Sequence, residues 1–188
     1  GYPEKIEKIF DLLQVDPEKS LYENEAAMDK VRTEYELEKL TKPVDRSVWL
    51  MPGNLNNACY DPQRNDLTFP AGILQKPFYD INQSRGANYG GIGATIGHEV
   101  SHAFDNNGAK FDENGNMNNW WTKQDFTEFN KRVGQMIDIF DGLQYGPAKI
   151  NGKQVVSENI ADLAGLACAV QAGKNDGADL KDLFENYA

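Results

Sequence analysis

The chain has two histidines, and both lie in one short segment, residues 97–105, which constrains the fold more than any other part of the sequence. On a helix that advances 100° per residue, His102 lies about 40° and Asp105 about −20° from His98, so the three side chains share one narrow face. Two imidazoles one turn apart can direct nitrogens at a single metal ion. The segment therefore predicts a helix with a zinc site on its polar face and Glu99 beside that site as a general base.

The same helical wheel predicts how this helix packs. Its apolar residues fall between about 120° and 200° from His98, opposite the polar face; they are Ile92, Ile96, Val100 and Ala103. Such an apolar back is expected to pack on the protein core. A chance placement of two histidines at this spacing, with Glu directly after the first, is improbable. The pattern thus favours a metal site over two unrelated surface histidines.

A catalytic zinc normally takes three protein ligands, so a third must come from elsewhere in the chain. The chain has no further histidine, and Cys59 and Cys168 lack a ligand-like spacing, which leaves a carboxylate. The best candidate is Glu158, at the start of a helix expected over residues 158–172. Asp162 follows one turn later and is suited to hydrogen-bond the free nitrogen of a ligating histidine. We expect one zinc ion per chain.

The remaining sequence predicts a single domain of class α+β, mainly helical, over residues 1–188. Residues 1–42 have a helical pattern and form a lead-in. Short strands are expected at residues 47–50 and 67–69, joined through a turn at 61–66 that is rich in turn-forming residues. Further helices are expected over residues 122–140 and 179–187, with a loop at 142–152.

Composition excludes several functions. The chain has 19 Lys and Arg against 29 Asp and Glu, a net charge of −10. Nucleic-acid binding is therefore not expected, because neutralising phosphates needs a basic surface. The longest apolar stretch, near residues 163–170, is well short of the roughly 20 residues that cross a bilayer, so no membrane segment is expected. The two cysteines are interpreted as reduced, which favours a cytoplasmic location.

Residues 43–172 closely resemble the neprilysin family of zinc metallopeptidases, which includes bacterial endopeptidase O-like enzymes and is a branch of the thermolysin-like zincin fold. The resemblance covers residues 43–46, 69–75, 77–78, 88–93, 97–105 and 120–122, together with Glu-Asn-Ile-Ala-Asp at 158–162. It implies that zinc is bound by His98, His102 and Glu158 and that Glu99 is the general base. It also implies that Asp105 and Asp162 support the ligating histidines.

The resemblance further implies how a substrate is bound. Asn57 and Ala58 would lie on an edge strand that pairs with a peptide, and Ile73 and Phe78 would line an apolar pocket for the residue after the scissile bond. The implied activity is that of an endopeptidase that hydrolyses peptide bonds with zinc-activated water, on oligopeptides and near hydrophobic residues. Family members are several-fold longer, so we expect this chain to be part of a catalytic domain. Its partners would be peptides and the remaining helical and C-terminal parts of a longer polypeptide, and alone it would be weakly active.

Two other interpretations stay open at this point. In the first, the ligands form a structural zinc module in which no water is activated. An open fourth position, detected through inhibition by a hydroxamate or phosphonate, distinguishes an enzyme from such a module. In the second, the chain is a metal-free packing domain of a larger assembly, which metal analysis of the purified chain would exclude.

Overall fold

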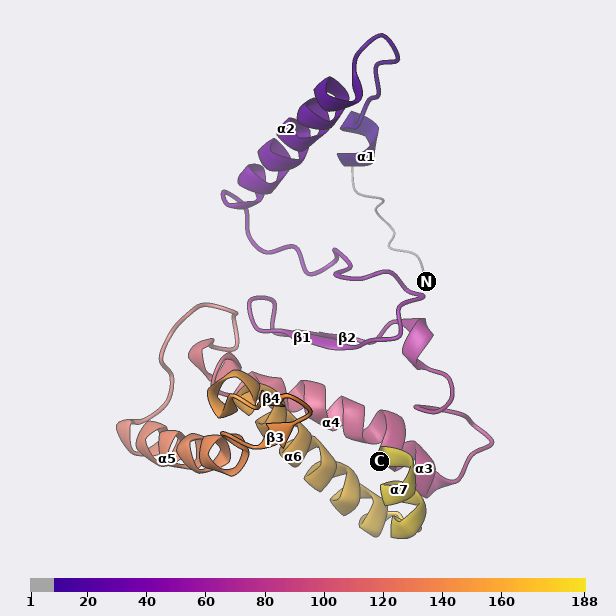
Figure 1. Cartoon of the computed structure of the whole chain (residues 1–188), viewed down its shortest axis with the longest axis vertical. Helices are drawn as coiled ribbons and strands as arrows, with labels where there is room; N and C mark the ends of the chain where they lie inside the picture. Colours follow the sequence, from indigo (N-terminus) through magenta and orange to yellow (C-terminus); the bar gives the residue numbers. More distant parts are fainter. Residues whose placement is uncertain (1–8) are drawn as a thin grey trace. The chain divides into compact units, whose positions relative to one another are not determined.

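The computed structural model describes residues 9–188, and the chain divides into two compact units, Gly1–Leu50 and Met51–Ala188. The first unit contains a short helix α1 (Ile9–Leu12) and a longer helix α2 (Leu21–Lys39) (Figure 1). α2 begins at a capping box in which Ser20 and Glu23 each satisfy the other's backbone N–H. The helical lead-in is thus present after residue 8, and its first eight residues lie outside the described part. That residues 1–188 form a single domain stays a prediction.

The second unit contains the expected hairpin, built from β1 (Cys59–Asp61) and β2 (Asp66–Thr68). The strands are antiparallel, with Cys59 opposite Thr68 and Asp61 opposite Asp66. The turn between them is closed by Asn65, whose φ of 45° lies in the left-handed region that asparagine tolerates well. The turn and the second strand of the predicted hairpin are thus present, but its first strand is not the one expected.

The strand predicted at residues 47–50 is wrong, because these residues form turns and bends. The cause is local. The carboxylate of Asp45 accepts hydrogen bonds from both the backbone N–H of Ser47, at 2.9 Å, and its hydroxyl, at 2.6 Å. Side-chain bonds of this kind offer the backbone an alternative to strand pairing and favour a turn.

The rest of the second unit is mainly helical. Its elements in chain order are η1 (Ala71–Ile73), α3 (Arg85–Asn88), η2 (Tyr89–Gly93), α4 (Ala94–Ser101), η3 (His102–Phe104), η4 (Gly108–Lys110), α5 (Lys123–Phe140), β3 (Gln144–Tyr145), β4 (Ala148–Lys149), α6 (Gly152–Asn175) and α7 (Leu180–Tyr187). α5 and α7 confirm two predicted helices, and β3 and β4 form a small hairpin within the expected loop. The predicted class, α+β and mainly helical, is confirmed.

α6 begins six residues earlier than predicted, at Gly152. The side chain of Asn151 caps it by accepting from the backbone N–H groups of Lys153 and Gln154. Glu158 therefore lies in the second turn of the helix, within the regular hydrogen-bonded part. Small residues recur every four positions along one side of α6, at Ser157, Ala161, Gly165, Ala169 and Gly173.

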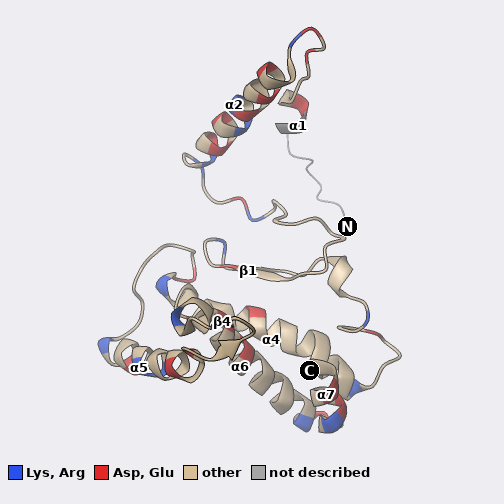
Figure 2. Ribbon diagram, viewed as in Figure 1, with Lys and Arg blue, Asp and Glu red and all other residues tan. Residues whose placement is uncertain are grey.

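α4 packs with a different face from the one predicted. Ile92, just before it, is buried, but Ile96 and Val100 are 45 % and 44 % exposed, so the expectation that they pack on the core is wrong. α4 instead buries Ala94 and Ser101 and packs against α6. Small side chains allow two helix backbones to approach more closely than branched ones do. Glu99 is the one Asp, Glu, Lys or Arg residue of α4, whereas α2 carries acidic and basic residues along its length (Figure 2).

An apolar cluster and one fully buried leucine support the second unit. Ala58, Ile73 and Ile92 form a buried cluster with Phe69 and Phe78 packed against it. The fully buried Leu183 of α7 lies against η2, the element that also contains Ile92. None of the helices in residues 9–188 is both long enough and apolar enough to cross a bilayer.

Candidate metal centre

The crossing of α4 over α6 positions the site. The two helices meet at Gly97 and Gly165, where a Cβ built on Gly97 would lie 2.8 Å from the Cα of Gly165. A Cβ built on Gly165 would lie 2.4 Å from the backbone nitrogen of His98. Neither position has room for a side chain, so the backbones touch. Because Asp162 precedes Gly165 by one turn, this crossing brings its carboxylate beside His98.

The three predicted ligands lie together. The Nε2 atoms of His98 and His102 are 2.9 Å apart, and the Oε2 atom of Glu158 lies 3.4 Å from the first and 3.6 Å from the second. Tetrahedral zinc ligands at about 2.0–2.2 Å from the ion lie about 3.3–3.6 Å from one another. Two of the three distances match this range, and the nitrogen pair is a few tenths of an ångström shorter. The donor set fits a zinc-sized ion.

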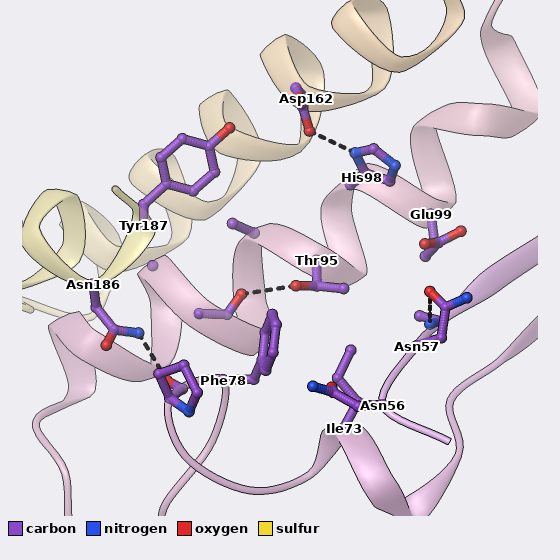
Figure 3. A pocket seen from close by; sticks show the side chains of 15 residues that line it. Asn56, Asn57, Ile73, Phe78, Thr95, His98, Glu99, Asp162, Asn186 and Tyr187 are labelled. Atoms are coloured by element: carbon purple, nitrogen blue, oxygen red, sulfur yellow. Dashed lines mark hydrogen bonds and ion pairs between the residues drawn. The ribbon is translucent and has the colours of Figure 1, made fainter.

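Each histidine ring is oriented by a carboxylate on its other nitrogen. His98 Nδ1 lies 2.7 Å from Asp162 Oδ1, and His102 Nδ1 lies 2.7 Å from Asp105 Oδ2 (Figure 3 shows the first pair). In the tautomer that donates from Nδ1, both Nε2 atoms keep their lone pairs for a metal. The hydrogen bond that His98 donates to Asp162 raises the pKa of His98, and the bond that His102 donates to Asp105 raises the pKa of His102.

Asp105 is only 2 % exposed and fully hydrogen-bonded. Its Oδ1 accepts from the backbone N–H groups of Asn107, at 2.6 Å, and Gly108, at 2.8 Å. Its Oδ2 accepts from His102 and from the hydroxyl of Ser157. Burial alone would favour the neutral acid, but these hydrogen bonds outweigh it and hold the pKa of Asp105 below its ordinary value. Asp105 is thus a fixed carboxylate.

Glu99 lies next in the chain to His98 and is 7 % exposed. Burial raises the pKa of its carboxyl above the ordinary value, although the charges of His98 and His102 act in the opposite direction. Its side chain lies at the edge of a cavity, close to Asn57 (Figure 3). A buried carboxylate with a raised pKa beside a metal site has the properties of a proton acceptor.

The cavity has a volume of about 310 Å³ and extends from His98, Glu99 and Asp162. All four residues predicted to bind substrate line it, namely Asn57, Ala58, Ile73 and Phe78. Asn57 and Ala58 lie directly before β1, so their position on an edge strand that pairs with a peptide stays a prediction. The side chain of Asn57 accepts from the backbone N–H of Ala58, a local bond that competes with strand pairing.

Several residues at the site were not predicted. Asn186 and Tyr187 of α7 also line the cavity. Asn186 donates from Nδ2 to the carbonyl oxygens of Pro77 and Ala87, which ties α7 to the cavity wall. The helical pattern of α7 was recognised, but nothing in it indicates contact with residues 99 and 109 positions earlier in the chain. Ser157, next to a predicted ligand, was also missed.

Comparison with known proteins identifies relatives of this chain. The sequence profile of peptidase family M13 matches residues 57–187. A neutral endopeptidase from Lactobacillus helveticus is 89 % identical over 188 residues, which are 100 % of this chain and 29 % of that protein. The crystal structure of PEPO from Lactobacillus rhamnosis HN001 is 46 % identical, with a TM-score of 0.87 over 100 % of this chain and 30 % of that one.

A third relative is a solved structure with a bound inhibitor. The crystal structure of the zinc metalloprotease Zmp1 from Mycobacterium tuberculosis is 38 % identical, with a TM-score of 0.88 over 100 % of this chain and 31 % of that one. The present chain therefore spans less than a third of the length of these three proteins.

Proposed function

Because the chain belongs to peptidase family M13, the neprilysin family, we propose that it carries the metal site of a zinc endopeptidase. The observation that carries the proposal is the cluster of His98, His102 and Glu158, with Glu99 and a cavity directly beside it. Two neutral imidazoles and one carboxylate are a donor set that suits zinc, at one ion per chain.

The described residues favour a catalytic site over a structural zinc module. Structural zinc is held by four protein ligands, whereas a catalytic site has three and one open position. Three donors meet in this cluster within the described residues, and a cavity opens beside them. An inhibitor with a hydroxamate group should therefore bind the zinc-loaded protein. A site closed by a fourth protein ligand would not bind it.

Each side chain has a separate task in the proposed reaction. His98, His102 and Glu158 hold the ion, while Asp162 and Asp105 fix the two rings with Nε2 toward it. Zinc bound there would supply Lewis-acid chemistry, acidifying a water molecule and polarising the scissile carbonyl.

Glu99 is the proposed general base. Its position at the cavity edge lets it accept a proton from the attacking water and pass it to the leaving amine. Its burial raises its pKa, so the carboxylate is a stronger base than an exposed glutamate would be. Proton transfer of this kind contributes about 10²- to 10⁴-fold to the rate of an enzyme.

The proposed substrates are oligopeptides with a hydrophobic residue after the scissile bond. Ile73 and Phe78 give the cavity an apolar wall, and Asn57 and Ala58 offer backbone and amide groups to a peptide along its rim. A volume of about 310 Å³ accommodates one large side chain and not an extended ligand. The rest of a peptide would have to lie outside the cavity.

Replacing Glu99 by Gln tests this function. The amide keeps the size of the side chain but cannot accept the proton, so zinc content should remain while peptide hydrolysis falls by about 10²-fold or more. The assay uses a protein of the length of the relatives, loaded with zinc. Glu128→Gln on the exposed face of α5 is the matched control and should leave the rate unchanged. Equal rates for Glu99→Gln and the control would contradict the role of Glu99.

We also propose that these 188 residues alone bind zinc but cleave peptides weakly. They span 29 % of the length of the Lactobacillus helveticus endopeptidase, so the remainder of such a polypeptide would be a partner in binding substrate. Turnover by the 188-residue chain should be compared with that of a protein of full relative length, both with excess zinc. Equal turnover would contradict this part of the proposal.

A further inference from the structure

The hydroxyl group of Ser157 connects α6 to the carboxylate that orients His102. Its Oγ donates to Asp105 Oδ2, the same oxygen that lies 2.7 Å from His102 Nδ1. The side-chain amide of Asn107 donates to Ser157 Oγ at 3.3 Å. A serine hydroxyl has one proton. Because Asn107 occupies a lone pair of this oxygen, the proton is directed to Asp105.

Ser157 differs from the other donors to Asp105 in where it comes from. The carboxylate of Asp105 accepts from four described donors, and three of them belong to residues 102–108, the same stretch of chain as Asp105 itself. Ser157 alone among these four belongs to α6. It also belongs to the row of small residues along one side of α6, one turn before Ala161. The hydroxyl thus connects the helix of Glu158 to the loop that supports His102.

We infer that Ser157 is a positioning residue of the metal site and acts through its hydrogen bond to Asp105. Asn107 sets the orientation of the Ser157 hydroxyl. The inference rests on the proposed function. Ser157 directly precedes the ligand Glu158, so its hydrogen bond to Asp105 fixes the position of Glu158. The same bond holds the carboxylate that orients His102. Loss of the hydroxyl leaves Asp105 Oδ2 with one donor and frees α6 to shift against His102.

Ser157→Ala tests the inference in the 188-residue chain. Zinc affinity is measured by competition with a chelator, and Co²⁺ is used as a spectroscopic probe of ligand geometry. Loss of a group that supports a metal ligand costs about 10- to 100-fold in affinity, and we expect the lower end, about 10-fold, because Ser157 acts through Asp105. The Co²⁺ absorption spectrum should change as well. Ser157→Thr keeps the hydroxyl and should restore both.

Ser101→Ala is the matched control. Ser101 is a buried serine of α4, and its hydroxyl donates to the carbonyl of Gly97, 2.7 Å away, within its own helix. This variant should lower the melting temperature of the metal-free chain about as much as Ser157→Ala does, without changing zinc affinity. If both variants lose zinc affinity equally, the effect is one of general stability and the inference is wrong.

Asn107→Ala provides an independent measurement. If Asn107 acts by orienting the hydroxyl of Ser157, its removal should lower zinc affinity less than Ser157→Ala does, and should have no further effect in the double variant. If the losses of zinc affinity add in the double variant, Asn107 does not act through Ser157. Equal zinc affinity for Ser157→Ala and the unchanged chain would overturn the role of Ser157 and leave the metal site standing. Failure of the unchanged chain to bind zinc would overturn both.

Discussion

Replacing Gly165 by Ala should disrupt the metal centre without touching any ligand. The added Cβ would lie 2.4 Å from the backbone nitrogen of His98, 2.8 Å from its Cα and 2.9 Å from the carbonyl oxygen of Ala94. These are backbone atoms of α4, which cannot rotate out of the way. Carbon contacts are comfortable from about 3.5 Å, so α6 would have to move away by about 1 Å.

That displacement is large on the scale of a metal site. Overpacking of this kind costs about 1–3 kcal/mol of folding free energy, which for a chain of this size lowers the melting temperature by about 2–12 °C. Ligand distances in a zinc site tolerate about 0.2 Å. Because Glu158 and Asp162 both move with α6, we expect zinc affinity to fall by at least about 10-fold, as it does when support of a ligand is lost.

The measurement is zinc competition with a chelator, combined with thermal unfolding of the metal-free chain. Gly134→Ala is the matched control, since Gly134 also lies inside a helix but has nothing within 4 Å of the position that an added Cβ would take. Alanine favours a helix over glycine by about 1 kcal/mol, so the control should be slightly stabilised and should bind zinc normally. If Gly165→Ala binds zinc with unchanged affinity and melts no lower than the unchanged chain, the glycine crossing does not set the site.

Three further outcomes are expected. Glu158→Ala removes one of three ligands, so zinc should be lost on dialysis against a mild chelator; full retention of zinc would disprove the assignment. Asp162→Asn should lower zinc affinity at pH 8 by about 10- to 100-fold, because it removes the carboxylate that fixes His98; an unchanged affinity would contradict that role. Zinc affinity should fall as the pH falls, starting above the ordinary histidine value of 6.5, because Asp162 raises the pKa of His98 and a protonated ring cannot bind metal. In Asp162→Asn the fall should begin at a lower pH, which chelator competition over about pH 5.5 to 8 would detect; coincident curves would contradict the coupling.

Local periodicity was sufficient to predict the common direction of His98 in α4 and His102, the first residue of η3. The spacing of His98 and His102 fixes their common direction on any helix, whatever the helix packs against. The same holds for Glu158 and Asp162, which remain one turn apart although α6 begins at Gly152 and not near residue 158. A change in a helix boundary leaves such an internal relation intact.

Hydrophobicity was a poor guide to how α4 packs. The wheel assigned Ile96 and Val100 to the core, yet both are more than two-fifths exposed, and the buried contacts are made by Ala94 and Ser101. Burial of apolar area favours large side chains at a helix contact. Where two helix backbones touch, however, only residues without a side chain fit between them. Gly97 and Gly165 have almost no weight in a hydrophobic pattern, so the pattern cannot reveal their pairing.

The sequence alone does not reveal which residues far apart in the chain come into contact. The four-residue spacing of small residues from Ser157 to Gly173 indicates that α6 packs closely on another helix, but it does not say which helix or at what register. That register decides whether Glu158 reaches the histidines at all, since a shift by one turn moves its carboxylate about 5.4 Å along the helix axis. The residue types that could bind metal therefore follow from the sequence. Their convergence depends on a glycine pair that bears no chemical group and on one serine hydroxyl two turns earlier on α6.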